Sequence, residues 1–305
     1  MAGTGHGTAV DAKAVAGSEA TLRSLELLVT HKLDGLLHGD HQGLFVGAGT
    51  EAGDGRLYQP GDDVRRIDWN LTARSNATHV RDTVPDRELE TWLVVDGSAS
   101  LDFGTARCEK RDLALAAAAA FGFLTARSGN RLGTVVFDGT GTSVLPPRTG
   151  RNAVMAVLHR LDRRARAGEG RPPLSGALRQ TRLLAGRRGL VVVVSDLLDD
   201  GDWPRELRAL ALHHDVVVAH VCDPRDVALP PVGLLTLVDP ETGERREVQT
   251  GNRRLRDRFA AAATAQREGA ARAFRAAGAT HLRLSTDRDW LLDVVRFAAT
   301  RKRRR

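Results

Sequence analysis

The sequence is poor in residues that build covalent or aromatic structure. Only Cys108 and Cys222 occur among the 305 residues, and aromatic residues make up 4% of the chain. Two cysteines make neither a disulfide framework nor a zinc cluster, and a reducing compartment suits such a chain. With little aromatic surface, the core must rest on Leu, Val and Ala, and stacking of single-stranded nucleic acid is disfavoured.

Long apolar segments are also missing. The first 17 residues are rich in Gly and Ala but lack the apolar core of a signal peptide. The apolar run 113–124 is too short to span a bilayer, so we expect a cytoplasmic protein. We expect a disordered tail over 1–17, a helix and signature extension over 18–90, an α/β domain over 91–300 and a basic tail over 301–305.

Motifs of common enzymes are absent as well. The sequence contains no Gly-x-x-x-x-Gly-Lys-Ser/Thr loop for a nucleotide. The segment Gly97–Ser100 lacks the second glycine of a hydrolase nucleophile elbow, and no histidine can be placed beside Ser98 as its base. We therefore expect that the chain is not an enzyme.

Positive charge exceeds negative charge. The formal net charge is +7, and the isoelectric point is about 10.3. This balance permits nucleic acid or an acidic partner, although a general bias of the genome toward Arg and Ala is the explanation that we favour. The tail 301–305 is either a solvated helix end or a contact for nucleic acid or acidic lipid.

Two apolar runs, 91–95 and 190–194, predict the centre of a parallel sheet. Both are continuous rather than alternating, which is typical of strands buried on both faces. Strand and helix patterns alternate from Thr91 onward, so we expect a Rossmann-like α/β fold with helices on both faces. Helices are expected over 18–37, 105–127, 152–163, 174–184, 203–213, 253–277 and 289–300. Further strands are expected over 131–138, 143–145, 216–221 and 281–286, with a hairpin over 234–248.

Each of the two runs ends in oxygen-bearing side chains. Asp96, Ser98 and Ser100 follow the first run, and Asp196 follows the second. Ligands of open α/β sheets bind beyond the carboxyl ends of the strands, where the strand order reverses. If the strands are neighbours, these oxygens meet and suit Mg²⁺ or Mn²⁺. Alternatively, Asp96 caps the next helix and the serines satisfy the backbone of a turn.

The pattern resembles the metal-ion-dependent adhesion site of von Willebrand factor A domains. In that site an Asp-x-Ser-x-Ser loop, a Thr from a second loop and a later Asp hold a divalent ion. Asp96, Ser98, Ser100 and Asp196 match these positions. The Thr has no counterpart because Pro172 or Pro173 falls there, which leaves one position to water or to Ser175.

A segment before the first strand, residues 58–74, has no clear helical or strand period. It combines a Pro-Gly turn with carboxylates, arginines and a tryptophan. It resembles the signature of the bacterial family called domain of unknown function 58, which precedes a von Willebrand A-like domain. The segment either binds a partner or forms a collar that pins the extension to the main domain. The candidate partner-binding residues are Asp62, Asp63, Arg66, Asp68, Trp69 and Arg74.

The resemblance also implies partners. Proteins of this type are expected to work with an AAA+ ATPase of the MoxR type, which hydrolyses ATP while this chain recruits a client protein. A partner carboxylate would then replace a water on the Mg²⁺ ion. The alternatives are a metal-dependent hydrolase acting on phosphate esters and a basic nucleic-acid-binding protein.

Overall fold

The computed structural model describes residues 19–37, 56–59, 67, 69–75, 77–80, 89–163, 173–199 and 201–303. The expected disordered tail over 1–17 lies outside these ranges. So do Pro172 and the last two residues of the basic tail.

A mainly parallel sheet organises the described part of the chain. Its six strands run in the order β10-β7-β6-β3-β4-β5, and only β5 is antiparallel to its neighbour. The strands are β3 (Glu90–Asp96), β4 (Arg131–Asp138), β5 (Gly141–Arg148), β6 (Leu190–Ser195), β7 (Asp215–Cys222) and β10 (Thr280–Ser285). The α/β prediction is confirmed, with the two Val-rich strands β3 and β6 adjacent at the centre.

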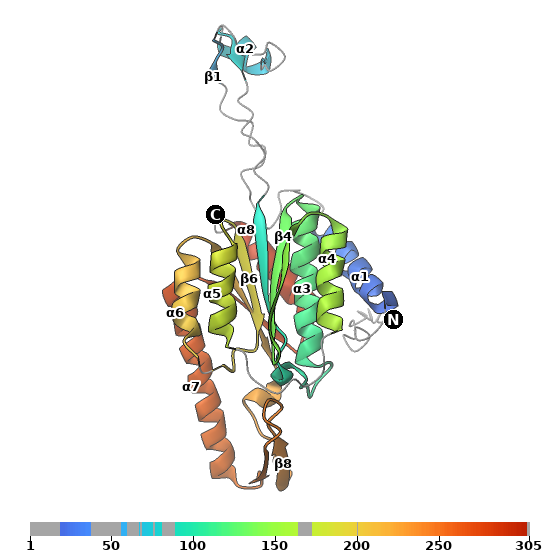
Figure 1. Ribbon diagram of the computed structural model, residues 1–305, viewed down its shortest axis with the longest axis vertical. Coiled ribbons are helices and arrows are strands. Elements are labelled where there is room, and N and C mark those ends of the chain that lie inside the picture. The colour runs from blue at the N-terminus through green and yellow to red at the C-terminus, as the bar shows by residue number, and fades with distance from the viewer. Residues whose placement is uncertain are drawn as a thin grey trace, which may run out of the picture.

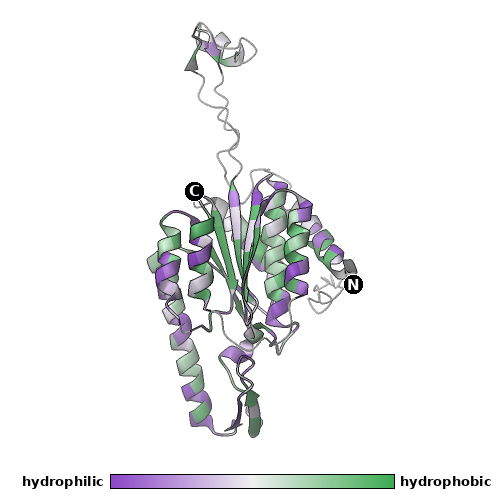
Figure 2. Cartoon of the chain, viewed as in Figure 1, coloured by the Kyte–Doolittle hydropathy of each residue, from purple (hydrophilic) through white to green (hydrophobic). Residues whose placement is uncertain are grey.

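Alternate residues of β3 point to opposite faces and build two cores. Leu93 and Val95 pack into one core, and Trp92 and Val94 pack into the other. Figure 1 shows helices covering both faces of the sheet, and Figure 2 shows apolar residues along the strands. The first core is covered by α1 (Glu19–Leu37), α3 (Lys110–Arg127), α4 (Arg151–Asp162) and α8 (Trp290–Arg303). The second is covered by α5 (Leu174–Leu184), α6 (Trp203–Ala211) and α7 (Arg253–Ala277).

Helix α1 packs with the main sheet. Its residues Leu22, Leu25 and Val29 are buried within the first core, and Glu26 pairs with Arg151 of α4. This helix therefore contributes to the same core as the α/β domain that follows it.

Helix α3 starts at Lys110, not at Thr105 as expected. The amide and the hydroxyl of Thr105 both donate to Asp223 at the end of β7. Glu109 and Asp112 then cap the helix reciprocally. The residues before Lys110 are thus held by the loop after β7 and are not available to a helix.

The edge strand β5 is longer than expected. It continues through Pro146 and Pro147 to Arg148, whereas the sequence predicted a strand over 143–145 only. A proline is tolerated at an edge because no further strand requires its missing N–H group.

A hairpin and a long helix extend past the carboxyl ends of the strands (Figure 1). The hairpin pairs β8 (Leu234–Val238) with β9 (Arg245–Gln249), as predicted. Helix α7 then returns to the sheet, where Ala270 and Phe274 of its carboxyl-terminal half are buried. The amino-terminal half of α7 and the hairpin together form a projection, which we call the arm.

None of the described helices combines the length and the apolar character that crossing a bilayer requires.

A close backbone contact fixes the pairing of β6 with β3. A Cβ atom on Gly189 would lie 2.0 Å from the carbonyl oxygen of Glu90, whereas a Cβ atom on Gly186 would meet nothing within 4 Å. We expect Gly189→Ala to lower the free energy of unfolding by at least about 2 kcal/mol, because backbone cannot yield as a side chain can. Gly186→Ala is the matched control. Urea denaturation that gives both variants the same stability would contradict this account.

Candidate functional site

The loop after β3 gathers three oxygen-bearing side chains. The backbone amide and the hydroxyl of Ser98 donate to Oδ1 of Asp96, at 2.9 and 2.6 Å. The hydroxyl of Ser98 lies 2.9 Å from that of Ser100. All three residues are buried, with at most 7% of their surface exposed. The predicted convergence within this loop is therefore present. Asp96 is not the cap of the next helix, because Ser98 precedes the 3-10 helix Ala99–Leu101 and Glu109 precedes α3, but Asp96 does accept from a backbone amide of the turn.

The end of β6 closes the same cluster. The Ser195 hydroxyl donates to Oδ2 of Asp96 at 2.6 Å and accepts from the amide of Leu197 at 3.0 Å. Leu197 has a φ of 58°, an unfavourable conformation for a leucine. This tight turn directs Asp196 to the carboxyl edge beside Asp96, at the point where the strand order reverses.

A buried lysine contacts Asp196. Nζ of Lys110 lies 2.7 Å from Oδ2 of Asp196 and 3.6 Å from Oδ1 of Asp226. The other oxygen of Asp196 accepts from the amide of Leu198 at 3.3 Å. Both carboxylate oxygens of Asp196 thus have donors within the chain, which the sequence did not reveal.

The charges of the site shift each other's protonation. Burial and the neighbouring Asp196 raise the pKa of Asp96 to about 6, against the hydrogen bonds from Ser195 and Ser98. Burial alone would lower the pKa of Lys110, but Asp196 and Asp226 raise it above its ordinary value. At neutral pH the lysine is therefore charged, and Asp96 is mostly ionised.

A knot of hydrogen bonds around Asp223, directly after β7, supports the site. Asp223 accepts from the amide and hydroxyl of Thr105 and from the hydroxyl of Thr286, at 2.6 to 2.8 Å. Burial would raise the pKa of Asp223, yet these hydrogen bonds hold it below its ordinary value. The amide of Asp223 in turn donates to Asp226, which orients that carboxylate toward Lys110.

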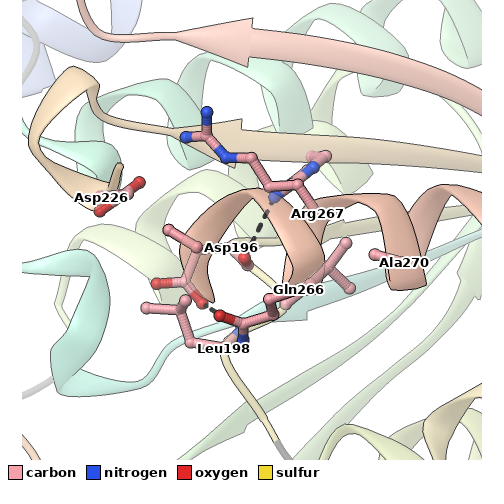
Figure 3. A pocket seen from close by; sticks show the side chains of 9 residues that line it. Asp196, Leu198, Asp226, Gln266, Arg267 and Ala270 are labelled. Carbon is pink, nitrogen blue, oxygen red and sulfur yellow. Dashed lines mark hydrogen bonds between the residues drawn. The ribbon is translucent and has the colours of Figure 1, made fainter. Parts of the chain in front are cut away.

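A pocket opens beside Asp196, between the carboxyl edge of the sheet and α7. Figure 3 shows Asp196 and Asp226 near Gln266 and Arg267 of α7. His220 also lines this pocket, and its Nε2 lies 3.2 Å from the carbonyl oxygen of Asp196. Burial, followed by the charge of His281, lowers the pKa of His220 to about 3. This histidine is therefore neutral and weakly basic, which does not suit a general base at neutral pH.

The tip of the hairpin also reaches the site. Oε1 of Glu241 accepts a hydrogen bond from the amide of Ser100 at 2.9 Å. Oε2 of Glu241 is buried and has no hydrogen-bond partner among the described residues. A carboxylate from a segment 141 residues along the chain thus covers the Asp-x-Ser-x-Ser loop.

The predicted partner-binding residues are only partly described. Asp62, Asp63, Arg66 and Asp68 lie outside the described residues. Trp69 and Arg74 lie on the short helix α2 (Trp69–Ser75), next to the small sheet of β1 (Arg56–Leu57) and β2 (His79–Val80). Trp69 is 70% exposed, so within the described residues it does not serve as core. The chain enters β3 at Glu90, at the edge opposite to Asp96.

Three residues of the site were not predicted from the sequence. Ser195 directly precedes Asp196, and its position at the strand end was a usable signal. Lys110 lies in a charged segment that is typical of a solvent-exposed helix start, and Glu241 lies in a hairpin turn far along the chain. Neither pattern indicates burial beside Asp96.

Comparisons with known proteins support the family resemblance inferred from residues 58–74. The family described as protein of unknown function DUF58 matches residues 54–269. The chain belongs to this family. Uncharacterized proteins of Mycobacterium tuberculosis and Mycobacterium bovis are each 54% identical over 285 residues, covering 93% of this chain and 90% of the relative. The resemblance expected from residues 58–74 is thereby confirmed.

Solved structures show a more distant likeness. An aerotolerance-related membrane protein of Bacteroides fragilis is 12% identical, with a TM-score of 0.47 over 71% of this chain and 100% of the other. The Rpn10 von Willebrand A domain is 13% identical, with a TM-score of 0.40 over 68% of this chain and 93% of the other.

The buried ion pair provides a test of the site's construction. We expect Lys110→Met to lower the free energy of unfolding by about 3–5 kcal/mol, because it leaves Asp196 and Asp226 charged and uncompensated in the interior. Adding Asp196→Asn to this variant should restore part of the loss, since one buried charge is removed.

The control is Arg272→Met, which removes an exposed pair with Glu268 on α7. Its effect should stay below about 0.5 kcal/mol. Urea denaturation in which Lys110→Met matches Arg272→Met would refute the proposed importance of the ion pair.

Proposed function

We propose that this chain is a protein-interaction module that binds a partner's carboxylate through a Mg²⁺ or Mn²⁺ ion held at the carboxyl edge of its sheet. The observation that carries the proposal is the cluster of oxygens on Asp96, Ser98 and Ser100, with successive atoms 2.6 and 2.9 Å apart. Hard oxygen donors of this kind suit a small divalent cation.

The excess of negative over positive charge at this edge supports the binding of a cation. Four carboxylates lie along the carboxyl edge and the hairpin tip that reaches it, and Lys110 lies between two of them, although no three of the described His, Cys, Asp and Glu residues group closely enough to hold an ion by themselves. The four are Asp96, Asp196, Asp226 and Glu241. Carboxylates held close together repel one another, so an additional cation would stabilise their ionised forms. The unpartnered Oε2 of Glu241 has the same requirement.

The ligands follow from the contacts. Asp96, Ser98 and Ser100 would hold the ion directly. Asp196 would act through water, because the charged Nζ of Lys110 already lies 2.7 Å from its Oδ2. The Thr of the resemblance has no counterpart, so water, Ser175 in the first turn of α5 or another carboxylate would complete the shell. A bound ion would supply a positive centre to which a partner's carboxylate coordinates.

The geometry favours binding over catalysis. The Ser98 hydroxyl donates to Asp96 rather than to a histidine, and His220 is too weak a base at neutral pH. The chain also has no nucleotide-binding loop of its own. An AAA+ ATPase of the MoxR type therefore remains the partner that we propose, with this chain recruiting its client.

Cation binding can be measured directly. We expect titration calorimetry to detect Mn²⁺ or Mg²⁺ binding, and Asp96→Ala to weaken it at least about tenfold by removing the one carboxylate of the loop. Asp138→Ala is the matched control, because Asp138 ends the adjacent strand β4 and bonds its own turn. Wild-type protein that binds neither cation would disprove the proposal.

Partner binding provides an independent test. We expect a purified MoxR-type ATPase to bind this chain in Mg²⁺ and to be released by EDTA. Ser100→Ala should weaken binding by removing one oxygen ligand. Trp69→Ala should weaken binding without loss of stability if the exposed indole contacts the partner. A complex that forms equally well in excess EDTA would rule out the cation bridge.

A further inference from the structure

The arm turns back toward the sheet. The chain leaves β7 at Asp223 and runs through 227–233, and the β8–β9 hairpin then places the turn 239–244 against the loop after β3. At the base of the hairpin, the hydroxyl of Thr250 donates to the carbonyl of Gly233 and accepts from the amide of Val232. The tip is therefore directed at the carboxyl edge by its own fold.

The turn at the tip is built to present Glu241. Oδ1 of Asp239 accepts from the amide of Glu241. The backbone carbonyl of Asp239 accepts from the amide of Gly243, whose φ is 70°. The amide of Glu244 donates to Thr242. These bonds fix the backbone on both sides of Glu241, so its carboxylate reaches Ser100 from a defined position.

The two oxygens of Glu241 have different surroundings. Oε1 accepts from the amide of Ser100, while Oε2 is buried with no donor in the described structure. A buried carboxylate oxygen without a partner is costly. A cation beside Ser100 would satisfy it, and it would also neutralise the charge of Asp96.

We propose that Glu241 is an intramolecular ligand of the carboxyl-edge cation site, a step that rests on the function proposed above. In the loaded protein, Oε2 of Glu241 binds the cation and occupies a position that a partner's carboxylate would otherwise take. The partner is therefore an acidic segment that competes with the hairpin tip for the same ion.

The hairpin suits such an exchange because little of it is buried. Most side chains of β8 and β9 are exposed, including Leu234 and Val238. Segments with few buried contacts open at low free-energy cost. A carboxylate that arrives on a partner can thus displace Glu241 without unfolding the sheet.

The first experiment measures Mn²⁺ affinity by titration calorimetry. Glu241→Gln keeps an oxygen that can accept from Ser100 but removes the charge, and we expect Mn²⁺ to bind about tenfold more weakly. Glu244→Gln is the matched control, because Glu244 lies in the same turn but pairs with Arg246 at the surface. Its affinity should stay within about twofold of wild type.

The second experiment counts water on the bound ion by proton relaxation of Mn²⁺-loaded protein. Glu241→Ala should raise the relaxivity per bound ion, since water takes the vacated position. Millimolar acetate should lower the relaxivity again in Glu241→Ala and leave wild type unchanged. This readout distinguishes a ligand from a residue that merely supports the loop.

The outcomes separate the two proposals. If wild type binds Mn²⁺, Asp96→Ala does not, and the Glu241 variants match wild type in affinity and relaxivity, then Glu241 is not a ligand and the cation site stands. If wild type binds no Mn²⁺, both proposals fail.

Discussion

The ion pair between Lys110 and Asp196 is the interaction on which the carboxyl edge of this protein depends. Parallel strands that are buried on both faces end together, and here their ends bring carboxylates to one place in the interior. Such a cluster is stable only if positive charge and hydrogen bonds accompany it. Lys110 supplies the charge from the first turn of α3, and the knot around Asp223 supplies much of the hydrogen bonding. The late start of α3 follows from the same requirement, because Thr105 belongs to that knot.

The same edge combines rigid and weakly held parts. The loop after β3 is buried and fixed by short hydrogen bonds to Asp96, whereas the hairpin that reaches it is largely exposed. The fixed oxygens suit the cation that we propose, and no side chain of β8 or β9 belongs to either core. The arm therefore adds a component to the site that the sheet topology alone does not provide. Its carboxylate comes from within the chain, whereas in our proposal the partner supplies another.

The sequence predicts the sheet well because uninterrupted Val-rich runs occur mainly in strands that are buried on both faces. It also predicts that Asp96 and Asp196 lie at one edge, since strand direction and the order reversal determine that position. Lys110 escapes prediction because its burial depends on how the first turn of α3 packs, which no local pattern records. Glu241 escapes because the direction of the hairpin depends on the path of residues 227–233. The predicted roles of Asp62, Asp63, Arg66 and Asp68 stay predictions.

The two prolines of β5 affect how this protein can associate. A sheet normally grows at its edge when another strand accepts and donates backbone hydrogen bonds. Pro146 and Pro147 offer no N–H group to such a strand, so this edge is a poor template for pairing with a second copy or with an unfolded chain. In the interaction module that we propose, partners bind at the ends of the strands, and the prolines leave this side of the sheet unsuited to a second copy.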